Sequence, residues 1–182
     1  MVAVDSSALI PLIRIGKLPL LEKYFKKIKI TREIYNELIS GVIGVSEFEK
    51  ACNSWITIYE KSEEFEKISE LENIGKADVS IILLAQKEKE ILLSGDYMLI
   101  NVAKSKGIEC LWLTAFIIKC TEKNILDKEE AKQILLDLIK AGTRLNNQVY
   151  SLILKKIDEI KSNKKIDAQK AKDESRRIWK ME

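Results

Sequence analysis

The sequence predicts a three-layer α/β/α sandwich, in which helices cover both faces of a five-stranded, mainly parallel sheet, followed by a helical C-terminal extension. Two observations predict this class. Short runs of aliphatic and β-branched residues alternate with helical patterns over the first two thirds of the chain. Each run has the length of a strand buried on both faces, and such alternation is typical of parallel strands joined by crossover helices.

The expected strands are VAV (2–4), KIKI (27–30), WITIY (55–59), ILLS (91–94) and ECLWL (109–113). Helical patterns fill the intervals, and the first is broken near Gly16 to Pro19. They cover residues 7–25, 32–40, 46–55, 63–74, 77–90 and 96–107.

After the last expected strand only helical patterns remain, at residues 114–124, 127–142 and 148–160. Gly142 is expected to end the second of them. We therefore expect a domain at residues 1–120, a helical extension at 121–160 that packs on the domain or on a partner, and a basic tail at 161–182. Apolar helices beyond the sheet also favour a homodimer.

The composition excludes several kinds of chemistry. The chain has 182 residues, 46% of them hydrophobic, and none is histidine, which excludes a Ser-His-Asp nucleophile and any imidazole metal site. Cys52, Cys110 and Cys120 are widely spaced, so we expect neither disulfides nor a thiolate zinc site. Because the chain has neither a secretory leader nor an apolar run that could span a bilayer, we expect a cytoplasmic protein with no membrane contact.

The formal charge of +3 is unevenly distributed. Residues 161–182 hold 8 basic and 4 acidic side chains, a net charge of +4, so the preceding 160 residues sum to −1. The basic excess therefore lies in the tail.

Three aspartates stand where a helix is expected to begin. Asp5 follows VAV and Asp96 follows ILLS, at the carboxyl ends of strands, where ligands bind in an open parallel sheet. Asp78 opens a strongly apolar helix after Gly75. Each of the three could instead cap or stabilise its helix, with Ser6 or Ser7 as the cap in the first case. Glu37, in the helix after the second strand, could be solvated surface.

If these four acids form one site, their negative charges require a counter-charge. If they converge to within about 5 Å, each pair repels by roughly 3 kcal/mol and the six pairs by about 20 kcal/mol. Either some of the acids stay protonated with raised pKa values, or a hard cation is bound among them. An all-oxygen site with open positions suits Mg²⁺ or Mn²⁺.

Taken together, the motifs VDSSALI, IYNEL, GKAD and LLSGD resemble those of the PIN-domain family of metal-dependent ribonucleases. The resemblance covers roughly Val2 to Leu154 and is greatest to the prokaryotic, VapC-like toxin branch. It implies that Asp5, Glu37, Asp78 and Asp96 are the catalytic and metal-binding acids. Ser6 and Ser94 would be the hydroxyls beside the first and last acid. Gly95 departs from the pattern, because related chains often carry an acid or polar residue there.

The resemblance implies a PIN-like fold and an endoribonuclease that cleaves RNA with one or two Mg²⁺ or Mn²⁺ ions, as the toxin of a toxin–antitoxin pair with an antitoxin protein as partner. Glu37 would be a metal ligand or the base that orients the attacking water. Candidates for phosphate contacts are Lys76, Arg14 and Arg32, together with Lys17.

Two other classes of function are open on the sequence alone. The same fold could be a non-catalytic module that binds RNA or a protein, with structural acids. A phospho-accepting aspartate protein would also place an acid after the first strand. The phosphatases of that kind expect a second aspartate where this chain has Ser7, and receiver domains expect paired acids at that strand end.

Overall fold

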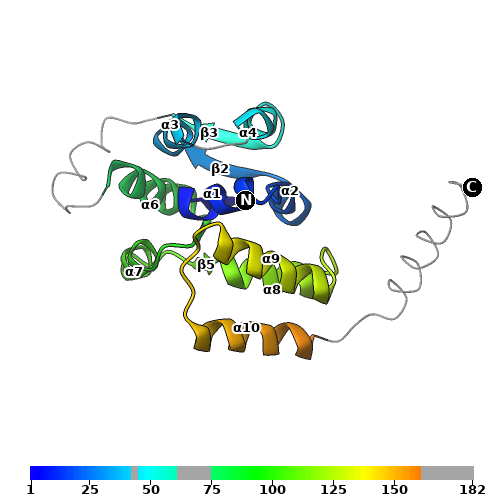
Figure 1. Ribbon diagram of the computed structural model, residues 1–182. Coiled ribbons are helices and arrows are strands. Elements are labelled where there is room, and N and C mark those ends of the chain that lie inside the picture. The colour runs from blue at the N-terminus through cyan, green and yellow to red at the C-terminus, as the bar shows by residue number, and fades with distance from the viewer. Residues whose placement is uncertain (42–44, 61–74, 161–182) are drawn as a thin grey trace, which may run out of the picture.

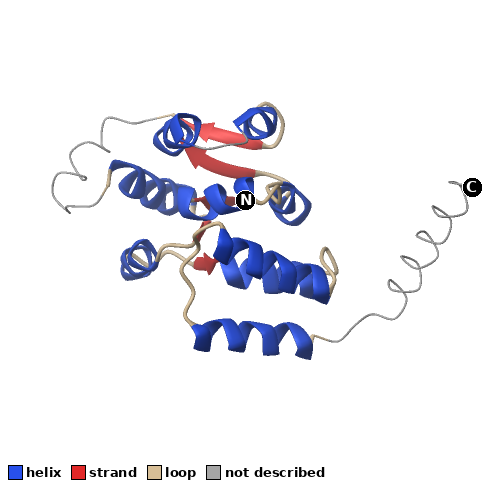
Figure 2. Ribbon diagram, in the orientation of Figure 1, coloured by secondary structure: helices blue, strands red, loops and turns tan. Residues whose placement is uncertain are grey.

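The computed structural model describes residues 1–41, 45–60 and 75–160 and shows the predicted three-layer sandwich (Figures 1 and 2). Its sheet has the strand order β3-β2-β1-β4-β5, and all four adjacent pairs are parallel. The strands are β1 (Val2–Val4), β2 (Ile28–Thr31), β3 (Ile56–Tyr59), β4 (Ile91–Ser94) and β5 (Cys110–Trp112). The chain moves outward from β1 to β3 and then returns to β4 on the other side of β1. The carboxyl ends of β1 and β4 therefore form the switch point, where open sheets bind ligands.

Helices connect the strands as the sequence predicts, with ends that differ from the expected ones by at most three residues. They are α1 (Ser6–Arg14), α2 (Pro19–Phe25), α3 (Arg32–Gly41), α4 (Val45–Cys52), α6 (Lys76–Glu88) and α7 (Tyr97–Ser105). The C-terminal helices are α8 (Leu113–Glu122), α9 (Lys128–Lys140) and α10 (Asn147–Glu159). The helix expected at 63–74 and the basic tail at 161–182 lie outside the described residues.

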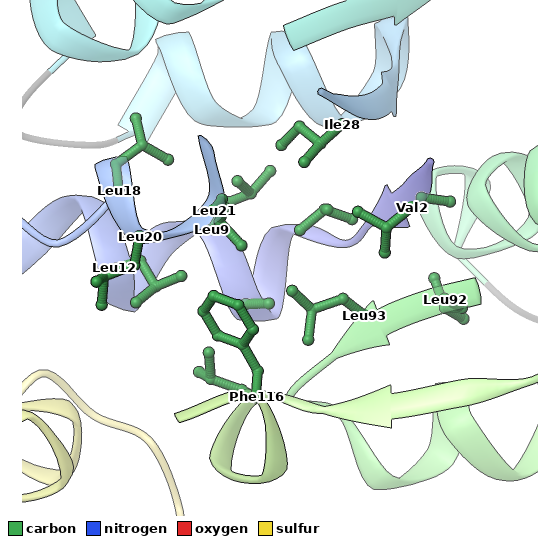
Figure 3. Packing of buried hydrophobic residues seen from close by; sticks show 14 of the residues in the cluster. Val2, Leu9, Leu12, Leu18, Leu20, Leu21, Ile28, Leu92, Leu93 and Phe116 are labelled. Atoms are coloured by element: carbon green, nitrogen blue, oxygen red, sulfur yellow. The ribbon is translucent and has the colours of Figure 1, made fainter. Parts of the chain in front are cut away.

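The central strand explains why the sheet must be covered on both sides. Side chains alternate between the two faces along a strand, yet Val2, Ala3 and Val4 are all fully buried. Helices therefore cover both faces. Figure 3 shows the aliphatic side chains of α1 and α2 meeting Leu93 of β4 and Phe116 of α8 in one core.

The C-terminal extension joins this core. The buried residues of α9 and α10, such as Leu135 and Ile157, belong to the same hydrophobic cluster as the strands. Helix α9 begins with a capping box between Asp127 and Glu130 and ends before Gly142, whose φ of +103° suits glycine at a helix end. No helix in the described ranges combines the length and apolarity needed to cross a membrane.

The amino edge of the sheet holds an ion-pair network around one buried lysine. Lys29 of β2 is 8% exposed, and its Nζ lies 2.8 Å from Glu88 and 3.0 Å from Glu90. The amino group of Met1 lies 2.9 Å from the second carboxylate of this network, that of Glu90. The hydrogen bond to Glu88 raises the pKa of Lys29, against the lowering by burial. The network fixes the start of β1 and β2 against the end of α6.

Candidate metal centre

Asp5 joins the end of β1 to the start of α1. Its backbone N–H donates to the Leu93 carbonyl at 3.0 Å, which continues the pairing of β1 with β4. Its side chain is the N-cap of α1, because Oδ2 accepts the Ser7 N–H at 3.1 Å. The cap is thus Asp5 itself, not Ser6 or Ser7. The residue is 2% exposed.

The two carboxylate oxygens of Asp5 have different surroundings. Oδ2 accepts hydrogen bonds from the Ser7 hydroxyl and from Ser94 Oγ, the latter at 3.1 Å. Oδ1 is buried and has no hydrogen-bond partner among the described residues. Burial raises the pKa of Asp5, while the bonds from Ser7 and Ser94 act to lower it. A buried carboxylate oxygen without a partner costs free energy, which a bound cation would offset.

Ser94 links Asp5 to Asp96 across the end of β4. Its hydroxyl donates to Asp5 and accepts the Asp96 N–H at 2.9 Å. Asp96 is the N-cap of α7, and its Oδ1 accepts the Leu99 N–H at 2.9 Å. The first and last acids of the predicted set therefore lie at one edge of the sheet, each held by a cap.

Ser7 takes the place that was expected for Ser6. Its hydroxyl contacts Asp5, lies 3.0 Å from Ser94 Oγ, and accepts the Gly95 N–H at 2.9 Å. Within the described ranges, no hydrogen bond of the Ser6 side chain is found. Both serines lie in the first turn of α1, so helix position alone does not separate them. What distinguishes Ser7 is its contact with Gly95, 88 positions away in the chain, for which the sequence carries no local signal.

Gly95 allows the two acid-bearing turns to approach each other. A Cβ atom at this position would lie 3.0 Å from the Ser7 carbonyl oxygen. That carbonyl receives no helical hydrogen bond, because the residue four positions on is Pro11, which lacks an N–H. A side chain at position 95 would therefore press on the start of α1.

Asp78 lies in the first turn of α6, three residues after the N-cap Gly75, and is half-buried. Its pKa is raised to about 6, first by burial and then by the negative charges of Asp5, Asp96 and Glu37. Glu37 itself is exposed on α3. All four predicted acids are therefore close enough for their charges to act on one carboxyl group.

A buried hydroxyl pair holds the two helices that carry Glu37 and Asp78. Thr31 Oγ1 and Ser80 Oγ lie 2.7 Å apart, and both residues are 1% exposed. Thr31 also accepts the Ile34 N–H at 3.4 Å where α3 begins. The sequence did not single out Thr31 or Ser80, because neither belongs to a motif.

The chemistry of these groups fits a hard divalent cation. All the candidate donors are carboxylate oxygens, which Mg²⁺ and Mn²⁺ prefer, and one of them is the buried Oδ1 of Asp5 without a partner. In the ranges that the structure describes, no three acidic or cysteine side chains are gathered tightly enough to hold an ion as they stand. Carboxylates without a counter-charge between them repel each other, and a bound cation would offset that repulsion.

The predicted phosphate contacts have unequal surroundings. Arg32 is engaged by Glu60, with Nε 3.1 and 3.2 Å from its oxygens, and lies over the ring of Tyr35. Arg14 donates to the carbonyl of Ala141 at 3.2 Å. Lys76 is exposed on the first turn of α6, two residues before the third acid.

Comparison with known proteins gives one match. The family model DUF3368, described as a PIN domain, matches residues 1–159. No curated protein and no solved structure matches the chain.

Proposed function

The chain belongs to the PIN-domain family, and we propose that it is a metal-dependent endoribonuclease whose acids are Asp5, Glu37, Asp78 and Asp96. PIN domains are generally nucleases and typically use divalent metal ions. The observation that carries the proposal is the buried Oδ1 of Asp5, which lacks a partner in the described residues, at a site where the charges of Asp5, Asp96 and Glu37 act together on the carboxyl of Asp78.

Each acid has a distinct part in this proposal. Asp5, Asp78 and Asp96 would hold one or two Mg²⁺ or Mn²⁺ ions, and the exposed Glu37 would be a further ligand or would orient the attacking water. When bound, such an ion lowers the pKa of water and neutralises charge on the phosphodiester. Ser7 and Ser94 fix Oδ2 of Asp5 by hydrogen bonds, and this leaves Oδ1 for the ion.

Cleavage of labelled single-stranded RNA tests the proposal. The wild-type protein should cleave with Mn²⁺ and stop with EDTA, whereas Asp5→Asn, purified in the same way, should not cleave. Glu122→Gln, at an exposed position at the end of α8, is the matched control and should cleave normally. Equal Mn²⁺-dependent cleavage by wild type and Asp5→Asn would refute the assignment. Binding of RNA without any cleavage would favour the non-catalytic module.

We propose that the physiological role is that of a toxin restrained by an antitoxin protein. The support is the resemblance of the motifs and of the helical extension to the toxin-like branch of the family. Expression of the wild-type chain alone should arrest bacterial growth, and expression of Asp5→Asn should not.

We also propose a homodimer. Its support is a set of exposed apolar side chains on α9 and α10, namely Leu136, Ile139, Val149 and Leu152. Light scattering after gel filtration should give twice the chain mass for wild type and a monomer for Leu152→Glu.

A further inference from the structure

A groove of about 960 Å³ opens beside the acids. Ser7, Gly95 and Asp96 belong both to its lining and to the hydrogen-bonded end of β1 and β4. Its other walls come from α1, α7, α8, the end of β5, the connection between α9 and α10, and the first turn of α10. The groove is therefore continuous with the proposed metal centre and is closed on one side by the C-terminal extension.

An aromatic pair lies in the wall of this groove. The rings of Tyr97 and Trp112 are stacked, with centroids 6.2 Å apart and planes at 28°. Tyr97 is nevertheless 66% exposed, and Met98 beside it is 68% exposed. Large apolar side chains this exposed, one residue after a candidate metal ligand, offer a stacking surface. Nucleobases stack on such aromatic faces regardless of their sequence.

The charges along the groove suit a polyanion. Asp96 is the single acid in the described lining and lies at the end shared with the metal centre, whereas Arg14 and Arg144 supply positive charge elsewhere. Neither arginine forms an ion pair with another residue that the structure describes. The Thr143 hydroxyl oxygen in the same wall is buried without a hydrogen-bond partner in the described ranges.

We propose that this groove binds unpaired RNA nucleotides next to the cleaved phosphate. One base stacks on Tyr97, and the flanking phosphates lie against Arg14 and Arg144. The assignment rests on the proposed nuclease function, because the acids fix where the scissile phosphate lies. Bases inside a duplex are stacked on each other and cannot offer a face to Tyr97, so the groove selects single-stranded segments.

Fluorescence anisotropy with the full chain in EDTA tests the groove without cleavage. The probe is a labelled unpaired oligoribonucleotide, compared with a hairpin of equal length. Wild type should bind the unpaired probe more tightly. Tyr97→Ala should weaken that binding by roughly tenfold, and Tyr97→Phe should restore it because the ring is retained. Ile39→Ala, an exposed apolar residue of α3 outside the groove, is the control.

The salt dependence of binding separates the two kinds of contact. Arg144→Ala should reduce the slope of log K against log salt by about 0.7, the value for one phosphate contact on a single strand. Tyr97→Ala should leave this slope unchanged, and so should Lys140→Ala, an exposed lysine on α9 outside the groove. Melting curves from circular dichroism would show that each variant is folded.

If Tyr97→Ala and Arg144→Ala bind RNA as tightly as the two controls do, the proposal is overturned, and a protein segment becomes the alternative ligand of the groove. If the predicted binding differences are found in EDTA but no cleavage occurs with Mn²⁺, the assignment of the groove as an RNA site is supported and only the nuclease function is refuted.

Discussion

Replacing Asp78 by asparagine should stabilise the metal-free protein near neutral pH. The pKa of Asp78 rises from 3.8 to about 6 on folding, because the carboxyl is half-buried and faces the charges of Asp5, Asp96 and Glu37. A rise of this size corresponds to about 3 kcal/mol at full value. Because water still screens a half-buried group, we expect about 1 to 2 kcal/mol. For a chain of this length that is a Tm increase of about 3 to 6 °C.

The difference in Tm between Asp78→Asn and wild type should depend on pH. The folded state binds the Asp78 proton more tightly than the unfolded state, so folding loses stability as pH rises from about 4 through 6. Asparagine does not titrate. In EDTA, the Tm of Asp78→Asn should therefore equal that of wild type near pH 4 and exceed it at pH 7.5. Glu122→Gln, exposed on α8, should show no such trend.

Bound metal should reverse the stability order of wild type and Asp78→Asn. A cation bound among the acids stabilises the folded state, so Mn²⁺ should raise the Tm of wild type more than that of Asp78→Asn. A variant less stable than wild type at pH 7.5 in EDTA, or a difference that does not change with pH, would refute the reasoning. The acids would then not share one electrostatic site.

Gly95→Ala should lower the free energy of unfolding by about 1 to 3 kcal/mol and slow Mn²⁺-dependent cleavage, because its Cβ would press on the Ser7 carbonyl. The control is Gly41→Ala, which has no atom within 4 Å of its Cβ and should be neutral in melting and cleavage assays. Ser7→Ala should lower both Tm and cleavage rate because Asp5 loses a hydroxyl donor, whereas an equal effect of Ser6→Ala would contradict the observed contacts. Lys29→Met should lower stability in urea by about 1 to 2 kcal/mol, because Glu90 loses one of its two partners and keeps only the amino group of Met1, yet cleavage by the folded variant should match wild type.

Much of this architecture could be predicted from local patterns. A strand such as VAV, apolar at every position, had to be buried on both faces, and this made helices on both sides of a parallel sheet the expected arrangement. Asp5 and Asp96 were predicted correctly at the carboxyl edge because Asp5 follows β1 directly and Asp96 follows β4 after one glycine. The position of each aspartate relative to its strand was enough to predict where it lies.

Contacts between distant residues could not be predicted in the same way. The Thr31–Ser80 pair joins residues 49 positions apart, and the Ser7–Ser94 contact joins residues 87 apart. No periodicity or motif specifies which two hydroxyls will meet after the helices have packed. The groove lined by Tyr97 has the same origin, because its walls come from separate helices and from the extension.

The helix cap at Asp96 has an evolutionary consequence. It contributes about 1 kcal/mol to folding in addition to any chemistry. Asp78 opposes folding at neutral pH, and Asp5, whose pKa is also raised by burial, adds the cost of its unpartnered Oδ1. A duplicated copy of this protein, released from its catalytic duty, would therefore drift unevenly. Asp78 and the exposed Glu37 would be the first to change, and Asp96 would persist long after activity had gone.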